Sequence, residues 1–248
     1  VTGDIYVSLT KNGARGQTGP GLGGQSRGLD AANPRYYDDG EGNKGNPNGH
    51  IIRIKETGSD PAATTFNWDV YLFAAETGLD ATNINISGLT DDNDFSSPDG
   101  LWFSQANPGL MWIQTDDGSY TDVTNCMMLA AVPGSQGDGG AVNVTSLAVP
   151  SNGGLDQTVA TYAGKDATTA TLKRFLVGPK GCEVTGICET PDGKAIFVNI
   201  QHPGENTTAA NIALPANFES NWPGTNDVDR PRSSTIVITK DDGGVIGS

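Results

Sequence analysis

The sequence has few cations, few histidines and no long apolar run, and each shortage excludes a class of function. Its 15 Lys and Arg stand against 29 Asp and Glu, which gives a formal net charge of −14. Nucleic acid is therefore not the expected partner, since binding its phosphates needs a basic face. No apolar stretch reaches the roughly 18 residues of a membrane span, so no transmembrane segment is expected. The two histidines, His50 and His202, lie too far apart in sequence for a zinc-hydrolase motif.

Cysteine is also scarce, because the chain has only Cys126, Cys182 and Cys188. An odd count allows at most one internal disulfide. If residues 182–188 form one extended strand, Cys182 and Cys188 lie roughly 20 Å apart, which is too far for a bridge. A disulfide would therefore join Cys126 to one of the other two. No Cys-x-x-Cys spacing indicates structural zinc.

Composition favours one large all-β domain with many turns. The chain has 34 Gly and 14 Pro, and only 18% of its residues are charged. Residues 11–49 are dominated by Gly, Asn, Asp, Pro and Arg, which predicts a long irregular insertion of the kind that is functional or disordered. No stretch has a convincing helical period. Short apolar or alternating runs predict strands at 4–10, 50–56, 68–75, 100–104, 110–115, 126–132, 172–177, 183–189, 195–201 and 234–239.

One hairpin pattern occurs twice. The segment 100–116 aligns with the segment 186–202, because each holds a short strand, a turn with Pro and Gly, and a second strand that ends in polar residues. Repeated short hairpins favour a β-propeller over a sandwich. About ten strands supply only two and a half to three blades, whereas a closed ring needs four to eight. Either something else completes the ring, or this blade count is wrong.

Glu183 is the first candidate for a functional residue. It starts a short apolar strand close to Gly181, and an acidic residue near a glycine at a strand start is a common way to aim a hard-metal ligand into a cleft. An ordinary hairpin with a charged edge is the alternative. Asp99 occupies the corresponding place in the first copy of the repeat. The many carboxylates can supply oxygen ligands for calcium, or they can simply be solvated surface charge.

A set of short runs, spread in order over nearly the whole chain, points to one family. The runs are Asp30-Ala-Ala-Asn-Pro-Arg35, Asn48-Gly-His-Ile-Ile-Arg53, Thr65-Phe-Asn-Trp-Asp69, Ser97-Pro-Asp-Gly100, Trp112-Ile-Gln-Thr-Asp116, Glu183-Val-Thr-Gly186, Gln201-His-Pro-Gly-Glu205, Arg230-Pro-Arg-Ser-Ser234 and Gly243-Gly-Val-Ile-Gly247. Together they resemble the carboxy-terminal half of the PhoX-type bacterial alkaline phosphatases.

This resemblance implies a fold, an activity and a location. The family fold is a six-bladed propeller, so residues 1–248 are expected to form about three blades of that ring, or part of a larger propeller. The implied activity is hydrolysis of phosphomonoesters with a calcium and iron cluster and without a serine nucleophile. The implied location is the periplasm or the exterior, reached by twin-arginine export.

The resemblance also suggests roles for single residues. Glu183 is expected to bind the metal cluster, and Asp99 to bind calcium rather than iron. Asn33, Asp116 and Glu205 are further candidate metal ligands, with turn caps or surface acids as the alternative for each.

Arg35 is the candidate catalytic residue, because a guanidinium can hold a substrate phosphate through two parallel hydrogen bonds. Pairing with Asp30 or Asp38 is the alternative for Arg35. His202, just before a proline at a strand end, is expected to be a structural imidazole rather than a ligand.

Two departures from the family bear on function. The iron-binding cysteine motif and a Pro-Glu-Trp segment that supplies another glutamate ligand are absent from the chain, and none of its cysteines matches that motif. The amino-terminal half of the same protein, or a partner chain, is therefore expected to complete the metal shell. The predicted function is a portion of a secreted phosphatase. The alternative is a non-catalytic propeller fragment or homologue for binding or assembly at the cell surface; a gluconolactonase-like calcium propeller fits the ordered motifs poorly.

Overall fold

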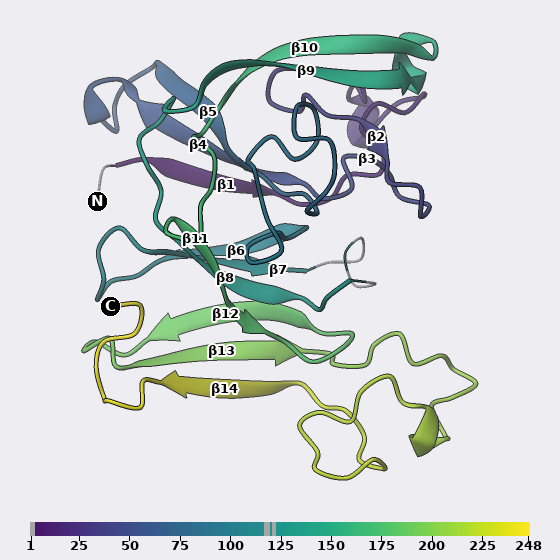
Figure 1. The fold of residues 1–248 in the computed structure, drawn as a ribbon, viewed down its shortest axis with the longest axis vertical. Helices are drawn as coiled ribbons and strands as arrows, with labels where there is room; N and C mark the ends of the chain where they lie inside the picture. The colour runs from purple at the N-terminus through teal and green to yellow at the C-terminus, as the bar shows by residue number, and fades with distance from the viewer. Residues whose placement is uncertain (1–2, 117–119, 121–122) are drawn as a thin grey trace. The chain divides into compact units, whose positions relative to one another are not determined.

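The computed structural model describes residues 3–116, 120 and 123–248, and these residues form β-strands and short 3-10 helices but no α-helix (Figure 1). The predicted all-β class is confirmed. The chain divides into two compact units. Unit 1 consists of Val1–Pro98 and Pro133–Thr171, and unit 2 of Asp99–Val132 and Leu172–Ser248. No described helix is long and apolar enough to cross a membrane. The propeller ring stays a prediction, as does the assignment of the whole chain to one propeller portion.

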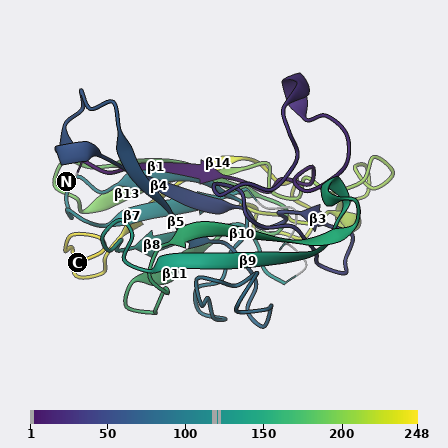
Figure 2. The same cartoon turned by 90° about the horizontal axis from the view of Figure 1, so that it is seen from above.

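Unit 1 is built on a five-stranded sheet with the order β1-β4-β5-β10-β9. Its strands are β1 (Ile5–Leu9), β4 (His50–Glu56), β5 (Phe66–Phe73), β9 (Gly140–Val149) and β10 (Leu155–Ala163). β4 pairs antiparallel with both β1 and β5, whereas β10 pairs parallel with β5 at its end. β9 and β10 form a long antiparallel ribbon (Figure 2).

The segment 11–49 of unit 1 is largely irregular, as the composition predicts. It contains the 3-10 helix η1 (Leu22–Gly24) and the two-residue strands β2 (Tyr37–Asp38) and β3 (Lys44–Gly45), which pair with each other. Further 3-10 turns in the chain are η2 (Thr57–Ser59), η3 (Pro150–Asn152) and η4 (Pro215–Asn217).

A buried ion pair ties the sheet of unit 1 to a neighbouring turn. Arg53 on β4 donates from Nη2 and Nε to the two carboxylate oxygens of Asp69 on β5, at 2.5 and 3.0 Å. It also donates to the carbonyl of Gly134 at 3.0 Å and to Asp138 at 3.1 Å. The side chains of Arg53 and Asp69 are fully buried. A buried charge needs such a complete set of partners.

Unit 2 contains two sheets. The first has the order β11-β8-β7-β6, and the second has the order β12-β13-β14. The strands are β6 (Pro98–Phe103), β7 (Met111–Thr115), β8 (Met127–Ala131), β11 (Leu172–Val177), β12 (Glu183–Glu189), β13 (Ala195–Gln201) and β14 (Ser234–Thr239) (Figure 1).

One apolar cluster connects the two sheets of unit 2. Its buried members include Trp112 and Met128 from the first sheet, and Val184 and Val198 from the second. Gln114 on β7 adds a polar link, because its Nε2 donates to the carbonyl of Gly186 on β12 at 3.2 Å. The core therefore fixes β7 against β12, and with them the residues at their ends.

The cysteines lie in or near this core without a bridge. None of Cys126, Cys182 and Cys188 forms a disulfide in the structure, and the first two are buried members of the apolar cluster. The sequence leaves open whether Cys126 forms a disulfide. A free cysteine packs as a small apolar side chain, and burial raises the pKa of the Cys182 thiol to about 12.

The buried ion pair of unit 1 gives a stability prediction. Asp69→Ala should lower the free energy of unfolding by about 3–5 kcal/mol, because it leaves the Arg53 charge buried without its main partner. Asp38→Ala is the matched control, since Asp38 pairs with Lys44 at 2.7 Å on the surface and surface pairs contribute little. Urea denaturation measures both, and an equal loss of stability in the two variants would contradict the prediction.

Candidate metal centre

Strand ends in unit 2 bring several acidic candidates together. Asp99 is the second residue of β6 and Asp116 directly follows β7, the neighbour of β6 in the sheet. Glu183 begins β12 and pairs in register with Gln201, the last residue of β13, so His202 follows at the same end. Asp99 and Glu183 thus both lie at the start of a strand, and Asp116 and His202 each follow the end of one.

The side chain of Gln114 approaches Gly100, the glycine that follows Asp99 in the repeat. A Cβ atom at Gly100 would lie 2.5 Å from Oε1 of Gln114 on the neighbouring strand β7. A larger residue would displace the Gln114 amide, whose Nε2 donates to the carbonyl of Gly186 on β12. The packing thus holds the start of β6 against the end of β7, where Asp116 follows.

Burial and neighbouring negative charges both act on the Glu183 carboxylate. Its side chain is buried, with 8% relative exposure. Its pKa is raised, first by burial and then by the negative charges of Asp116 and Asp99, while Thr185 and His202 act in the opposite direction. The negative charges of Asp116 and Asp99 therefore reach Glu183, and a bound multivalent cation is the usual means of relieving such repulsion.

His202 lies between two glutamates. Its Nε2 is 3.6 Å from Oε2 of Glu183, and its Nδ1 is 3.1 Å from Oε2 of Glu205. The Nδ1 atom is buried, and its contact with Glu205 lacks the geometry of a hydrogen bond. Within unit 2, His202 thus contacts both Glu183 and Glu205, while Asp116 and Asp99 act on Glu183 through their charge.

These side chains fit a hard cation in type but supply only part of a metal shell. Their carboxylate oxygens are the ligands that calcium prefers. Among the described residues, however, no group of three or more His, Cys, Asp or Glu side chains is arranged to hold a metal ion. The thiols of Cys126 and Cys182 are buried in the apolar core and offer iron no accessible ligand.

The other two candidates, Asn33 and Arg35, belong to unit 1. Asn33 forms a turn with Asp30, whose carboxylate accepts its backbone N–H at 2.9 Å and its amide at 3.2 Å. Arg35 is fully buried, and its two terminal nitrogens donate to the carbonyls of Ile84 and Gly49, each at 2.6 Å. It also donates to Asn46 at 2.8 Å. These are the contacts of a turn cap and a structural arginine, and the proposed roles in metal and phosphate binding stay predictions.

Sequence reasoning did not anticipate that His202 lies beside Glu183 and Glu205. The available signal was its position directly after the strand that pairs with the Glu183 strand, at the end where Glu183 lies. Its expected role as a structural imidazole came from its place before Pro203, which says nothing about neighbours from another strand.

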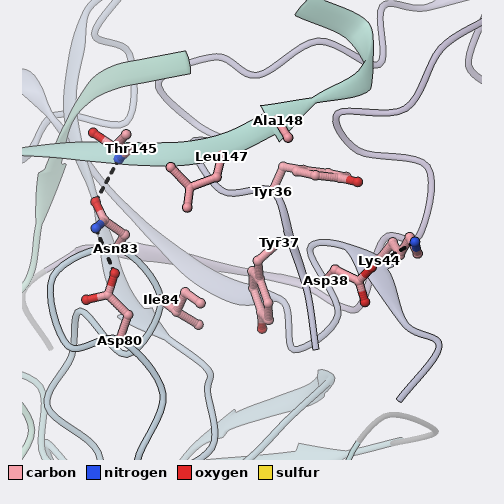
Figure 3. A pocket seen from close by; sticks show the side chains of 10 residues that line it. All are labelled: Tyr36, Tyr37, Asp38, Lys44, Asp80, Asn83, Ile84, Thr145, Leu147 and Ala148. Atoms are coloured by element: carbon pink, nitrogen blue, oxygen red, sulfur yellow. Dashed lines mark hydrogen bonds and ion pairs between the residues drawn. The ribbon is translucent and has the colours of Figure 1, made fainter. Parts of the chain in front are cut away.

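Unit 1 contains a separate pocket of about 520 Å³ (Figure 3). Ile84 and Leu147 line its middle, and polar side chains lie at its two ends. One end holds the Asp38–Lys44 ion pair at 2.7 Å. At the other, Asp80 accepts hydrogen bonds from Asn83 and from the backbone of Thr82, each at 2.8 Å. Asp38 and Lys44 therefore neutralise each other, whereas Asp80 accepts from neutral donors.

Comparison with known proteins identifies the family. A family model described as alkaline phosphatase PhoX matches residues 1–204. The chain belongs to the PhoX alkaline phosphatase family. Asp99, Asp116, Glu183 and His202 fall within the matched residues, and Glu205 lies just beyond them. The resemblance found in the sequence is confirmed.

A solved structure of a PhoX protein supports the same conclusion. The chain is 32% identical to Pseudomonas fluorescens PhoX, which was solved in complex with vanadate, a transition-state analogue, and the TM-score is 0.67. The match covers 99% of this chain and 33% of that chain, so this chain spans about a third of the length of that PhoX protein. None of the curated proteins compared with the chain matches it.

Replacing Glu183 or Glu189, the two glutamates of β12, should change the melting temperature in opposite directions when a chelator keeps the protein free of metal. Glu189 accepts hydrogen bonds from the backbone N–H of Gln105 at 2.8 Å and from the indole of Trp112 at 3.2 Å. Burial acts to raise the pKa of Glu189, but these hydrogen bonds outweigh it and the pKa is lowered. At pH 7, Glu183→Gln should therefore raise the melting temperature, whereas Glu189→Gln should lower it. Each kcal/mol corresponds to about 2–4 °C.

The pH dependence of these two effects follows from the shifts. Glu183 has a raised pKa, so its protonated form favours folding, and that stability is lost as pH rises through the raised pKa. The advantage of Glu183→Gln should accordingly disappear as pH falls below the usual glutamate pKa of about 4.3. Thermal melts between pH 4 and pH 8 measure this, and a Glu183→Gln variant less stable than the native protein at pH 7 would contradict the prediction.

Proposed function

We propose that this chain is a portion of a secreted, metal-dependent alkaline phosphatase that hydrolyses phosphomonoesters with a calcium and iron cluster. The observation that carries the proposal is the family match over residues 1–204, which contains the repelling carboxylates Glu183, Asp99 and Asp116. The remainder of the metal shell would come from the amino-terminal half of the same protein or from a partner chain. This accords with a chain that spans a third of the matched PhoX protein.

The acids of unit 2 would hold the cations. Glu183 and Asp99 are the proposed first ligands, calcium being the metal that suits their oxygens, and Asp116 is the next candidate because its charge also acts on Glu183. Glu205, and Asn33 and Arg35 of unit 1, keep the roles that the family resemblance suggests. When bound, the cations would neutralise phosphate charge and polarise the phosphoryl oxygens.

The charge of the chain explains why cations would be needed before substrate. A phosphomonoester is an anion, and it would meet grouped carboxylates on a chain whose formal net charge is −14. Carboxylates alone repel such a substrate, and in a partly buried site this repulsion is stronger than in water. The role of Glu183 and its neighbours would therefore be to concentrate negative charge so that cations bind. The bound cations would then make the local electrostatic potential positive, which attracts the phosphate.

The proposed location and architecture follow from the same resemblance. We propose export to the periplasm or the exterior, and a chain that forms about three blades of a six-bladed propeller. The antiparallel sheets of unit 2, one with four strands and one with three, are of the size of propeller blades.

A non-catalytic propeller fragment or homologue, used for binding or assembly at the cell surface, is the second candidate. One observation favours it, since the described residues contain no complete group of metal-binding side chains. The two functions differ in what must accompany the chain. An enzyme requires a further segment or chain with the missing ligands, which intact mass measurement of the purified protein would detect.

Phosphatase activity tests the proposal directly. The protein, purified with any associated chain, should hydrolyse a chromogenic phosphomonoester in the presence of calcium, lose this activity after strong chelation, and regain it when the metals are restored. Glu183→Gln should lower kcat/KM at least about 100-fold, since the loss of even an outer-shell partner of a metal costs about 10–100-fold. Asp192→Asn, in an exposed turn, is the control. Activity that survives both chelation and Glu183→Gln would refute the proposal.

A further inference from the structure

His202 lies in a backbone conformation that few side chains adopt. It follows β13 with a φ of 36°, in the left-handed region, although it is not a glycine. Histidine is one of the residues that tolerates this region best, but such a conformation is still strained and persists only where the surroundings hold it. Strain of this kind is a reason to ask what the side chain does.

Hydrogen bonds from neighbouring segments hold this turn. The backbone N–H of His202 donates to Oγ of Ser233 at 2.9 Å. Two residues on, the N–H of Gly204 donates to the carbonyl of Lys180 at 2.9 Å, and the N–H of Glu205 donates to the carbonyl of Gly181 at 3.2 Å. The turn at 202–205 is therefore fastened to the turn that leads into Glu183.

The consequence is a row of three side chains, Glu205, His202 and Glu183. The imidazole contacts one carboxylate through each of its nitrogens, at 3.1 Å for Glu205 and 3.6 Å for Glu183. Glu183 also faces the charges of Asp116 and Asp99. Glu205 is half-exposed on the far side of the ring. The row thus runs from the surface toward the group of repelling carboxylates.

We propose that His202 is a positioning residue for Glu183, with Glu205 as its outer partner. The inference rests on the proposed function, in which Glu183 is a metal ligand. Through Nε2, His202 would restrict the rotation of the Glu183 carboxylate and keep it directed toward Asp99 and Asp116. Glu205 lies on the other side of the ring, with its Oε2 3.1 Å from Nδ1. Residues that orient a metal ligand in this way strengthen metal binding without touching the metal.

A purely structural role for His202 makes a different prediction. If the ring only filled space at the turn, replacing it would change stability and leave calcium affinity unaffected. The test therefore needs a variant that keeps the backbone conformation. His202→Asn meets this need, because asparagine also tolerates the left-handed region, while its shorter side chain cannot bridge the two glutamates.

The first experiment needs no metal. His202→Asn, Glu183→Gln and the double variant are unfolded thermally in chelator, using the whole chain. The expected result is that the shifts in melting temperature are not additive, since coupled residues depart from additivity. Additive shifts would overturn the proposal, because they would show that His202 and Glu183 do not interact.

The second experiment measures calcium binding by titration calorimetry. His202→Asn should weaken the affinity for calcium about tenfold. His202→Gln, whose longer amide can approach Glu183, should recover part of that loss even if its backbone is less stable. Asp192→Asn is the control with native affinity. Native affinity in His202→Asn would overturn the positioning role. Native affinity in Glu183→Gln would instead refute the proposed metal ligand, while the metal-free experiment still decides whether His202 and Glu183 are coupled.

Discussion

The packing that keeps Glu183 within reach of the charges of Asp116 and Asp99 is the constraint on which the proposed site depends. The apolar cluster behind the strands, with Trp112 and Val184 among its members, fixes β7 against β12. The acids at the strand ends cannot separate without disturbing that packing. The favourable free energy of the core therefore offsets the unfavourable effect of Asp116 and Asp99 on Glu183. Protein interiors are close-packed and have low compressibility, so the strands keep these acids in place.

The two ends of β12 show how local partners decide the state of a carboxylate. Glu189 and Glu183 lie on one strand, and burial acts to raise the pKa of both. Glu189 meets N–H donors, which favour its charged form, whereas Glu183 meets like charges. A purely structural acid is normally satisfied as Glu189 is. Glu183 has a hydrogen bond from Thr185, but burial and the charges of Asp116 and Asp99 outweigh it, which accords with the proposed role of Glu183 as a metal ligand.

Much of the fold follows from short-range patterns, and much of the site does not. The strands at 50–56, 172–177, 183–189, 195–201 and 234–239 have their predicted bounds, because apolar alternation and turn residues define them locally. β9 and β10 were missed although they alternate clearly, since exposed apolar residues such as Leu147 and Leu155 break the usual assignment of apolar positions to the core. Asp99 and Glu183 were predicted from the repeat. The contact of His202 with two glutamates was not, because it depends on strand register and on one left-handed residue.

An incomplete oxygen shell is the arrangement expected of a site that several segments build. Among the described residues, the acids of unit 2 carry negative charge without a full set of ligand positions. Additional ligands would complete the coordination geometry, so that cations bind and their positive charge offsets the negative charge of the carboxylates. Such a site binds its metal weakly in a fragment and tightly in the assembled protein, because each added ligand reduces the entropy that remains to be lost on binding. Assembly and metal binding would thus stabilise each other, as any ligand stabilises the state that it prefers. The same carboxylates that disfavour the isolated chain would then make the assembled site dependent on its cations.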